Sequence, residues 1–163
     1  MNLKFKMESK DRSGEAHSLK RRNPMVVLRG ASEDLGGPAP LGTGQQILLS
    51  HHPADGEQVA KLKVLLDGNG YSATVYDNQE QIFDGLEQLD HMMELVSEAD
   101  GVIICMSGHY KGSKACRTEF EYSHYELGKP IILVNLEAGY IPEGWLDHLV
   151  GSQVWTNCES DAE

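Results

Sequence analysis

Hydrophobic and polar positions form alternating blocks from Gln45 to Trp155. Short apolar runs predict strands that are buried on both faces. The blocks between them carry apolar residues every three or four positions and predict helices. Because strands and helices alternate along the chain, the pattern predicts a doubly wound α/β domain. Its parallel sheet should have about five strands, with helices on both faces.

The predicted strands end at polar loops that should meet at one edge of the sheet. The strands are expected at Ile47–Ser50, Tyr71–Tyr76, Gly101–Met106, Pro130–Val134 and near Ser152–Trp155. Ligands of such sheets bind beyond the carboxyl ends of the strands, near the point where the strand order reverses. We therefore expect a site in the loops that follow Ser50, Tyr76 and Met106.

Three amphipathic helices are predicted between these strands. The first runs from a cap at Asp55 to Gly68, the second covers Leu86–Val96, and the third runs from a cap at Ser113 to Leu127. A looser segment, Ile141–Leu149, precedes the last strand. The start of the third helix should lie beside the predicted site.

The chain divides into an arm, a domain and a tail. Residues 1–44 lack an apolar period and are rich in Gly, Pro, Ala and Ser towards their end, so they are predicted to be a disordered N-terminal arm. Residues 45–156 form the predicted domain, and residues 157–163 form a tail. With only this tail after the last strand, we expect either that the chain is a piece of a longer protein or that another chain covers that face.

Charge is distributed unevenly between the arm and the domain. The chain has a net charge of −11, of which residues 1–44 contribute +3 and the remainder −14. An acidic domain repels phosphate backbones, so we expect no nucleic-acid partner. No apolar run approaches eighteen residues, and three cysteines suit a reducing compartment, so we expect no membrane insertion and a cytoplasmic location.

Several families with this architecture need loop residues that the chain lacks. A phosphoacceptor receiver domain needs an Asp at the end of the third strand, where this chain has Met106-Ser107. A flavin-binding flavodoxin needs a phosphate loop after the first strand, where His51-His52-Pro53 stands instead. Neither a P-loop nor a Gly-x-Gly-x-x-Gly motif occurs.

Four segments together resemble the landmarks of a Toll/interleukin-1 receptor (TIR) domain. They are Ile47–Ser50, Glu98–Ser107, Cys116-Arg117-Thr118-Glu119 and Gly128–Ile132, and their order and spacing agree with the family. The resemblance implies a flavodoxin-like fold and a signalling module that self-associates with other TIR domains. A subset of the family cleaves NAD at the nicotinamide–ribose bond. Residues 77–85 depart from the family pattern, which leaves the mode of assembly open.

The resemblance implies that Glu119 is the catalytic carboxylate of an NAD nucleosidase, from its place in the Cys-x-x-Glu pattern. Cleavage of the glycosidic bond builds positive charge on the ribose, which one well-placed carboxylate stabilises. The residues expected to contact NAD are Ser50, His51, Ser107 and Cys116. NAD is then a substrate, and no cofactor or metal ion is expected.

Other interpretations of the same residues stay open. Glu119 could face solvent while Arg117 pairs with Glu121, and His51 could be a surface side chain. Cys116 is expected to be a small buried residue and not a nucleophile, because no His lies near it in sequence. The alternative function is a non-catalytic scaffold for protein–protein interaction. A third is an enzyme similar to nucleoside deoxyribosyltransferases, which share the fold and a glycosyl-cleaving Glu.

Overall fold

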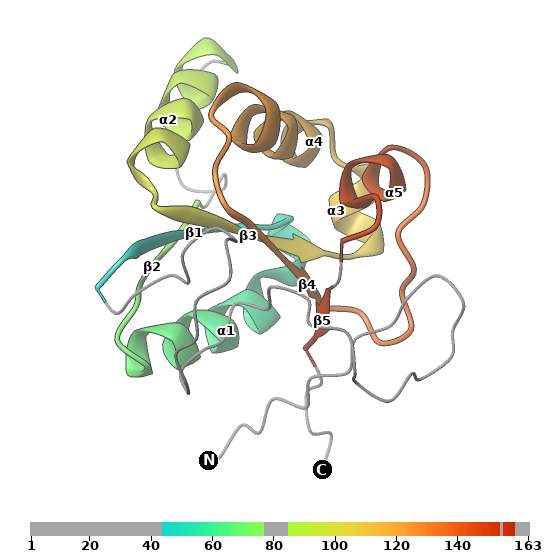
Figure 1. Cartoon of the computed structure of the whole chain (residues 1–163), viewed down its shortest axis with the longest axis horizontal. Coiled ribbons are helices and arrows are strands. Elements are labelled where there is room, and N and C mark those ends of the chain that lie inside the picture. The colour runs from blue at the N-terminus through green and yellow to red at the C-terminus, as the bar shows by residue number, and fades with distance from the viewer. Residues whose placement is uncertain (1–43, 77–84, 154, 159–163) are drawn as a thin grey trace.

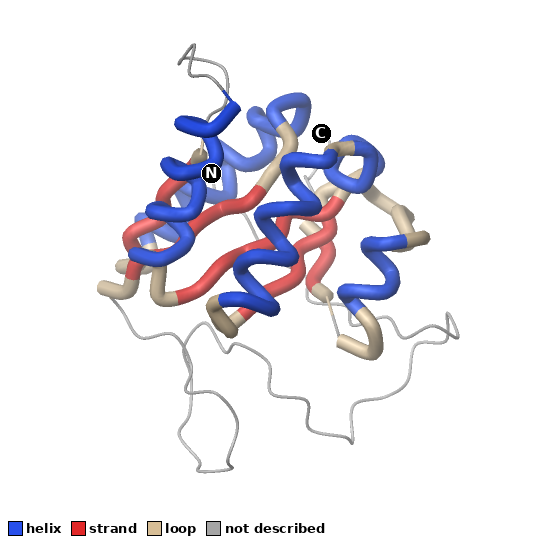
Figure 2. The backbone as a smooth tube through the Cα atoms, turned by 90° about the horizontal axis from the view of Figure 1, so that it is seen from above, coloured by secondary structure: helices blue, strands red, loops and turns tan. Residues whose placement is uncertain are grey.

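The computed structural model describes residues 44–76, 85–153 and 155–158. Within them, five strands form one parallel sheet in the order β2-β1-β3-β4-β5 (Figures 1 and 2). The predicted flavodoxin-like α/β fold is therefore confirmed. The predicted arm before Gly44, residues 77–84 and the end of the predicted tail lie outside the described residues.

The strands lie close to their predicted positions, with one exception. They are β1 (Gln46–Ser50), β2 (Ser72–Val75), β3 (Gly101–Met106), β4 (Ile131–Asn135) and β5 (Thr156–Asn157). The last strand was expected near Ser152–Trp155, but β5 begins directly after this range, at Thr156. The amide of Gln153 donates to the Val150 carbonyl, so the chain still forms a turn after α5.

Helices cover both faces of the sheet. They are α1 (Gly56–Gly68), α2 (Gly85–Glu98), α3 (Gly108–Gly112), α4 (Lys114–Glu121) and α5 (Trp145–Val150), with a 3₁₀ turn η1 (Pro53–Asp55) and a π-helical segment η2 (Tyr122–Glu126). In Figure 1, α1 lies on one side of the sheet, and α2, α4 and α5 lie on the other.

The cap predicted for the first helix was only partly right. Asp55 does precede α1, but its carboxylate makes no capping hydrogen bond. Instead, the His52 ring accepts a hydrogen bond from the Ala54 amide at 3.1 Å and caps η1. The Asp55 carboxylate is consequently available for contacts in another loop.

The third predicted helix is divided into separate elements. Ser113 caps α4 as expected, since its hydroxyl accepts from the Cys116 amide at 3.3 Å. The helix does not continue regularly to Leu127, because the Leu127 amide donates to the Tyr122 carbonyl in the π-helical pattern. The short helices α3 and α5 were not predicted; the second of them lies in the segment expected to be loose.

Alternate residues of the central strands belong to two separate hydrophobic cores. Ile47, Leu49 and Ile103 pack towards α1, with Val59 and Leu66 of that helix. The intervening strand residues Leu48, Val102 and Ile104 pack towards the helices on the other face. Their cluster includes Met92 of α2, Phe120 of α4 and Leu146 of α5. Because both faces of β1 and β3 are covered, these strands contain almost no polar residue before their carboxyl ends.

None of the helices in the described part of the chain has the length and apolarity that crossing a membrane requires.

The two-core arrangement predicts a large difference between two isoleucines. Ile104 on β3 is fully buried, whereas Ile141 is 75% exposed. Ile104→Ala should lower the free energy of unfolding by about 2–5 kcal/mol, because it leaves a cavity in the core. Ile141→Ala, the matched control, should change it by less than about 0.5 kcal/mol. Urea denaturation measures both, and equal losses would contradict the burial of β3.

Candidate functional site

The carboxyl end of β1 brings together four of the five predicted site residues. Ser50 ends this strand and is fully buried, and His51 directly after it is also buried. Helix α4 packs against this end, where the Cys116 thiol donates to the His51 carbonyl at 3.6 Å. Glu119 follows one turn later on the same face of α4. Residues more than sixty positions apart in sequence therefore form one cluster.

Glu119 points inward from α4. Its side chain is buried, with a residue exposure of 5%, and the adjacent Phe120 is buried in the core. On the outer face, Arg117 Nε donates to the Glu121 carboxylate at 2.8 Å, which confirms that predicted pair. The alternative in which Glu119 faces solvent is wrong. Arg117 and Glu121 lie on the solvent-exposed face of α4, whereas Glu119 lies on its buried face.

One carboxylate oxygen of Glu119, Oε1, is buried without a hydrogen-bond partner. Burial raises the pKa of Glu119 from 4.5 to about 7, because a carboxylate loses its hydration in the interior; a hydrogen bond with the Ser50 side chain acts in the opposite direction. At neutral pH both protonation states are therefore populated. An unpaired buried carboxylate is costly and needs an explanation.

The helix becomes π-helical at Tyr122, three residues after Glu119. The backbone carbonyl of Glu119 accepts a hydrogen bond from the buried Ser123 hydroxyl at 2.6 Å, at the start of η2. Short π-helical segments are frequent at functional sites. This one begins one turn after Glu119, and the sequence pattern gave no sign of it.

Cys116 is a buried thiol, as predicted. Its exposure is 4%, and burial raises its pKa to about 11. A thiol in that state is a poor nucleophile at neutral pH. Cys116 therefore contributes packing and a weak hydrogen bond to the His51 carbonyl, and it does not itself react.

Ser107, the fifth predicted residue, faces a different carboxylate. It caps α3 by accepting from the Tyr110 amide at 3.0 Å, and its hydroxyl donates to Asp55 Oδ2 at 2.5 Å. The other Asp55 oxygen lies 3.2 Å from His109 Nδ1, and the His109 ring stacks on His52 at 5.6 Å. These contacts join the loop after β1 to the loop after β3.

Tyr110 connects the cluster at Ser50 and Cys116 with Ser107, and its role was not predicted from the sequence. Its ring is fully buried, and its hydroxyl lies 2.8 Å from Ser50 Oγ and 3.2 Å from the Cys116 carbonyl. The one available signal was local, because Ser107 precedes Tyr110 by the spacing of a helix cap. No periodicity indicated that the tyrosine would turn towards a strand sixty positions away.

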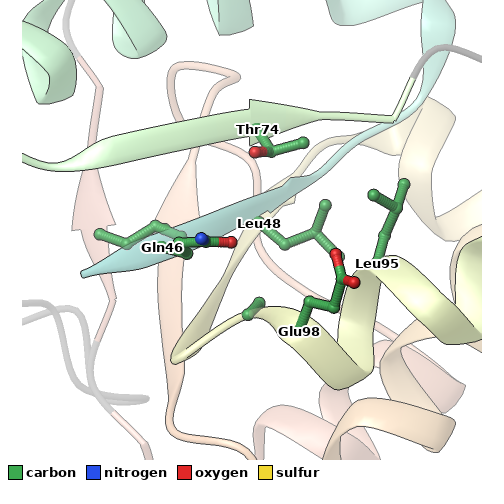
Figure 3. A pocket seen from close by; sticks show the side chains of 7 residues that line it. Gln46, Leu48, Thr74, Leu95 and Glu98 are labelled. Carbon is green, nitrogen blue, oxygen red and sulfur yellow. The ribbon is translucent and has the colours of Figure 1, made fainter. Parts of the chain in front are cut away.

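A small hollow elsewhere on the sheet does not belong to this site. It lies between the amino-terminal half of β1, β2 and the end of α2, and Figure 3 labels Gln46, Leu48, Thr74, Leu95 and Glu98 around it. Its volume of about 40 Å³ is far below the several hundred Å³ typical of small-molecule sites. Within the described residues, no three His, Cys, Asp or Glu side chains could hold a metal ion.

A family model described as "TIR domain" matches residues 47–163 of the chain. No curated protein sequence matches the chain. Among solved structures, the TIR domain of the Toll-related receptor TRR-2 from Hydra magnipapillata is similar over 68% of this chain and 82% of that chain, at 16% identity and a TM-score of 0.54. This likeness shows the fold.

Two further structures are similar to a lower degree. The 2-deoxyribosyltransferase from the bacterium Bacillus psychrosaccharolyticus is matched over 64% of this chain and 90% of that chain, at 20% identity and a TM-score of 0.47. The TIR domains of the activated Roq1 resistosome, which recognises the effector XopQ, are matched over 58% of each chain, at 17% identity and a TM-score of 0.46.

The burial of Glu119 predicts a stability difference that depends on pH. Because the folded-state pKa is raised, the folded protein loses stability as pH rises from about 4.5 to about 7, and the loss is complete above that range. Glu119→Gln cannot ionise, so it should be more stable than the wild type by about 3 kcal/mol at pH 8.5 and nearly equal to it at pH 4.5.

The control for this experiment is Glu121→Gln, which removes the same charge from an exposed ion pair. It should change the free energy of unfolding by less than about 1 kcal/mol at either pH. Chemical denaturation of the three proteins at both pH values gives the comparison. A Glu119→Gln difference that does not vary with pH would show that this carboxylate has an ordinary pKa.

Proposed function

The chain belongs to the TIR domain family, and we propose that it hydrolyses NAD to nicotinamide and an ADP-ribose product, with Glu119 as the catalytic carboxylate. The observation that carries this proposal is the buried, unpaired Oε1 atom of Glu119 at the carboxyl end of β1. The sequence resemblance points to the same residue through its Cys116-x-x-Glu119 spacing.

A buried carboxylate with one unpaired oxygen is better explained by ligand binding than by a contribution to stability. Leaving such a group unpaired costs about 1–3 kcal/mol or more, so it weakens the fold. A ligand hydroxyl or a developing positive charge would supply the missing partner. Titratable groups with strongly shifted pKa values are concentrated at functional sites for this reason.

The chemistry of NAD cleavage matches one such carboxylate. When the C1′–N bond breaks, its electron pair goes to the nicotinamide nitrogen, and positive charge develops on the ribose. The ionised Glu119 would stabilise that charge in a site with little water, where electrostatic interactions are strong. Water then adds to C1′ and loses a proton. Because nicotinamide leaves as a neutral molecule, no strong general acid is needed.

The residues around Glu119 are the ones that we assign to NAD contacts. Ser50, His51 and Cys116 lie with Glu119 where α4 meets the end of β1, which supports a role for them in holding the ribose. Ser107 lies at the neighbouring end of β3, where its hydroxyl is engaged with Asp55. Its assignment therefore requires that NAD compete for this hydroxyl or contact the loop backbone.

The proposal includes self-association, because the family consists of signalling modules that bind other TIR domains. We expect the chain to act in the cytoplasm and its catalytic activity to rise on assembly. If assembly occurs without cleavage, the chain is the non-catalytic scaffold that the sequence also allowed. The following experiment separates the two functions.

Purified protein, concentrated or held on a crowding surface, should release nicotinamide from NAD. Chromatography of the products measures the rate. Glu119→Gln keeps the side-chain volume and removes the charge, so it should lower the rate by at least about 100-fold, the usual weight of a group that stabilises transition-state charge. Since the ionised form is the active one, wild-type activity should rise with pH through about 7.

Glu121→Gln is the matched control, because it lies two residues away on the outer face of α4 and carries the same charge change. It should retain nearly the wild-type rate. Equal losses in both variants would indicate a general effect of charge or assembly. If wild-type protein that demonstrably self-associates releases no nicotinamide, the scaffold is the correct function.

A further inference from the structure

His109 in the first turn of α3 is exposed, and yet its ring is held in one orientation. Its side chain is 63% exposed, and its Nδ1 lies 3.2 Å from Asp55 Oδ1. The ring stacks on that of His52, with centroids 5.6 Å apart and an angle of 21° between the planes. The backbone before it is also fixed, because the Gly108 amide donates to Glu137 Oε2 at 3.0 Å. Ordering an exposed side chain costs conformational entropy, so this arrangement needs an explanation.

Asp55 is the residue that fixes the His109 ring. The Asp55 side chain is only 10% exposed, and its other oxygen, Oδ2, accepts from the Ser107 hydroxyl at 2.5 Å. Ser107 in turn accepts from the Tyr110 amide at 3.0 Å, so the carboxylate is joined to the cap of α3. Because both of its oxygens are engaged, Asp55 holds the imidazole in place and has no oxygen left for a ligand.

The pairing also determines which nitrogen of His109 carries a proton. An ionised carboxylate only accepts, so the proton between the two side chains belongs to Nδ1. Nε2 of the neutral ring then has a free lone pair, and it has no hydrogen-bond partner among the described residues. The His52 ring differs, because its Nδ1 accepts from the Ala54 amide at 3.1 Å. His109 is consequently the imidazole of this stacked pair that offers an acceptor.

This acceptor and Glu119 lie on two sides of the loop that follows β1. On one side, the His51 carbonyl accepts from the Cys116 thiol of α4 at 3.6 Å, one turn before Glu119. On the other side, the next residue, His52, stacks on His109. A ligand that lies across this loop therefore meets the carboxylate at one end and the imidazole at the other.

We propose that His109 Nε2 accepts a hydrogen bond from an O–H group of the bound reactants, and that Asp55 is the positioning residue of this imidazole. The role rests on the proposed function, because the O–H group belongs either to a ribose of the nucleotide or to the water that attacks C1′. In the second case the bond between the water oxygen and C1′ forms as one water proton moves to Nε2. Asp55 stabilises the imidazolium ion, which then releases this proton to solvent.

The charges around the ring favour a neutral hydroxyl over a phosphate as its partner. The Asp55 carboxylate contacts the ring, and the Glu137 carboxylate contacts the residue before it. Lys111, the lysine of α3, is paired with Glu143 at 3.1 Å. The two carboxylates would repel an anionic group, whereas a hydroxyl carries no charge.

The positioning role can be measured without a ligand. Nitrogen-15 NMR of histidine-labelled protein shows which ring nitrogen is protonated, and the His109 signals are those that His109→Phe removes. In the neutral ring of the wild type the proton should lie on Nδ1. Asp55→Ala removes the acceptor, so this preference should disappear. A wild-type ring protonated on Nε2, or an unchanged preference in Asp55→Ala, would overturn the proposal, and the wild-type result decides even if the variant does not fold.

The contact with the reactants is tested with His109→Phe, which keeps a planar ring beside His52 and removes both nitrogens. If the partner is a ribose hydroxyl, the dissociation constant of ADP-ribose, measured by calorimetry, should rise by about 10-fold. If the partner is the attacking water, kcat for NAD should fall by about 100-fold or more with little change in KM. His148→Phe, at an exposed histidine of α5, is the matched control and should change neither quantity.

A His109→Phe protein with unchanged affinity for ADP-ribose and unchanged kcat would overturn the proposal, because the imidazole would then only join two loops. Failure of the proposed function gives a different result. Wild-type protein that binds ADP-ribose and leaves NAD intact would refute NAD cleavage, and the binding measurement would still decide whether His109 contacts the ligand.

Discussion

The parallel pairing of β1 with β3 is the constraint on which the site depends. The register runs from Ile47 opposite Gly101 to Ser50 opposite Ile104, and these strand residues are buried. Since helices cover both faces, polar side chains fit only where a strand ends. Ser50 and Ser107 consequently reach the same edge of the sheet, at the point where the strand order reverses. The contacts that join β1 to α4 beside Glu119 start from that edge.

The cap on α4 determines which of its side chains reach this edge. Ser113 fixes the first turn, and the spacing of three residues then places Cys116 and Glu119 on the inner face. Phe120 anchors the helix in the core, so the carboxylate cannot turn outward without losing this packing. The neighbouring apolar contacts therefore offset the free-energy cost of burying a carboxylate that has an unpaired oxygen.

The strands and long helices could be predicted from the sequence because their apolar runs are continuous or regularly spaced. Helices of five or six residues, such as α3 and α5, are too short to show a period. The position of β5 depends on pairing with β4, where the Cys158 amide donates to the Asn135 carbonyl. Glu119 was found through a resemblance and not a pattern. Tyr110 was missed because its hydroxyl contacts a residue sixty positions away.

Two carboxylates lie at this edge of the sheet, and their surroundings assign them different roles. Both oxygens of Asp55 have partners, Ser107 on one side and His109 on the other, so this carboxylate joins two loops and has little left to offer a ligand. Glu119 is more deeply buried than Asp55, yet one of its oxygens has no partner. A fold that pairs both oxygens of the partly buried Asp55 could have paired the second oxygen of Glu119 with one more hydroxyl. The incomplete pairing of Glu119 therefore supports the proposal that its missing partner arrives with the substrate.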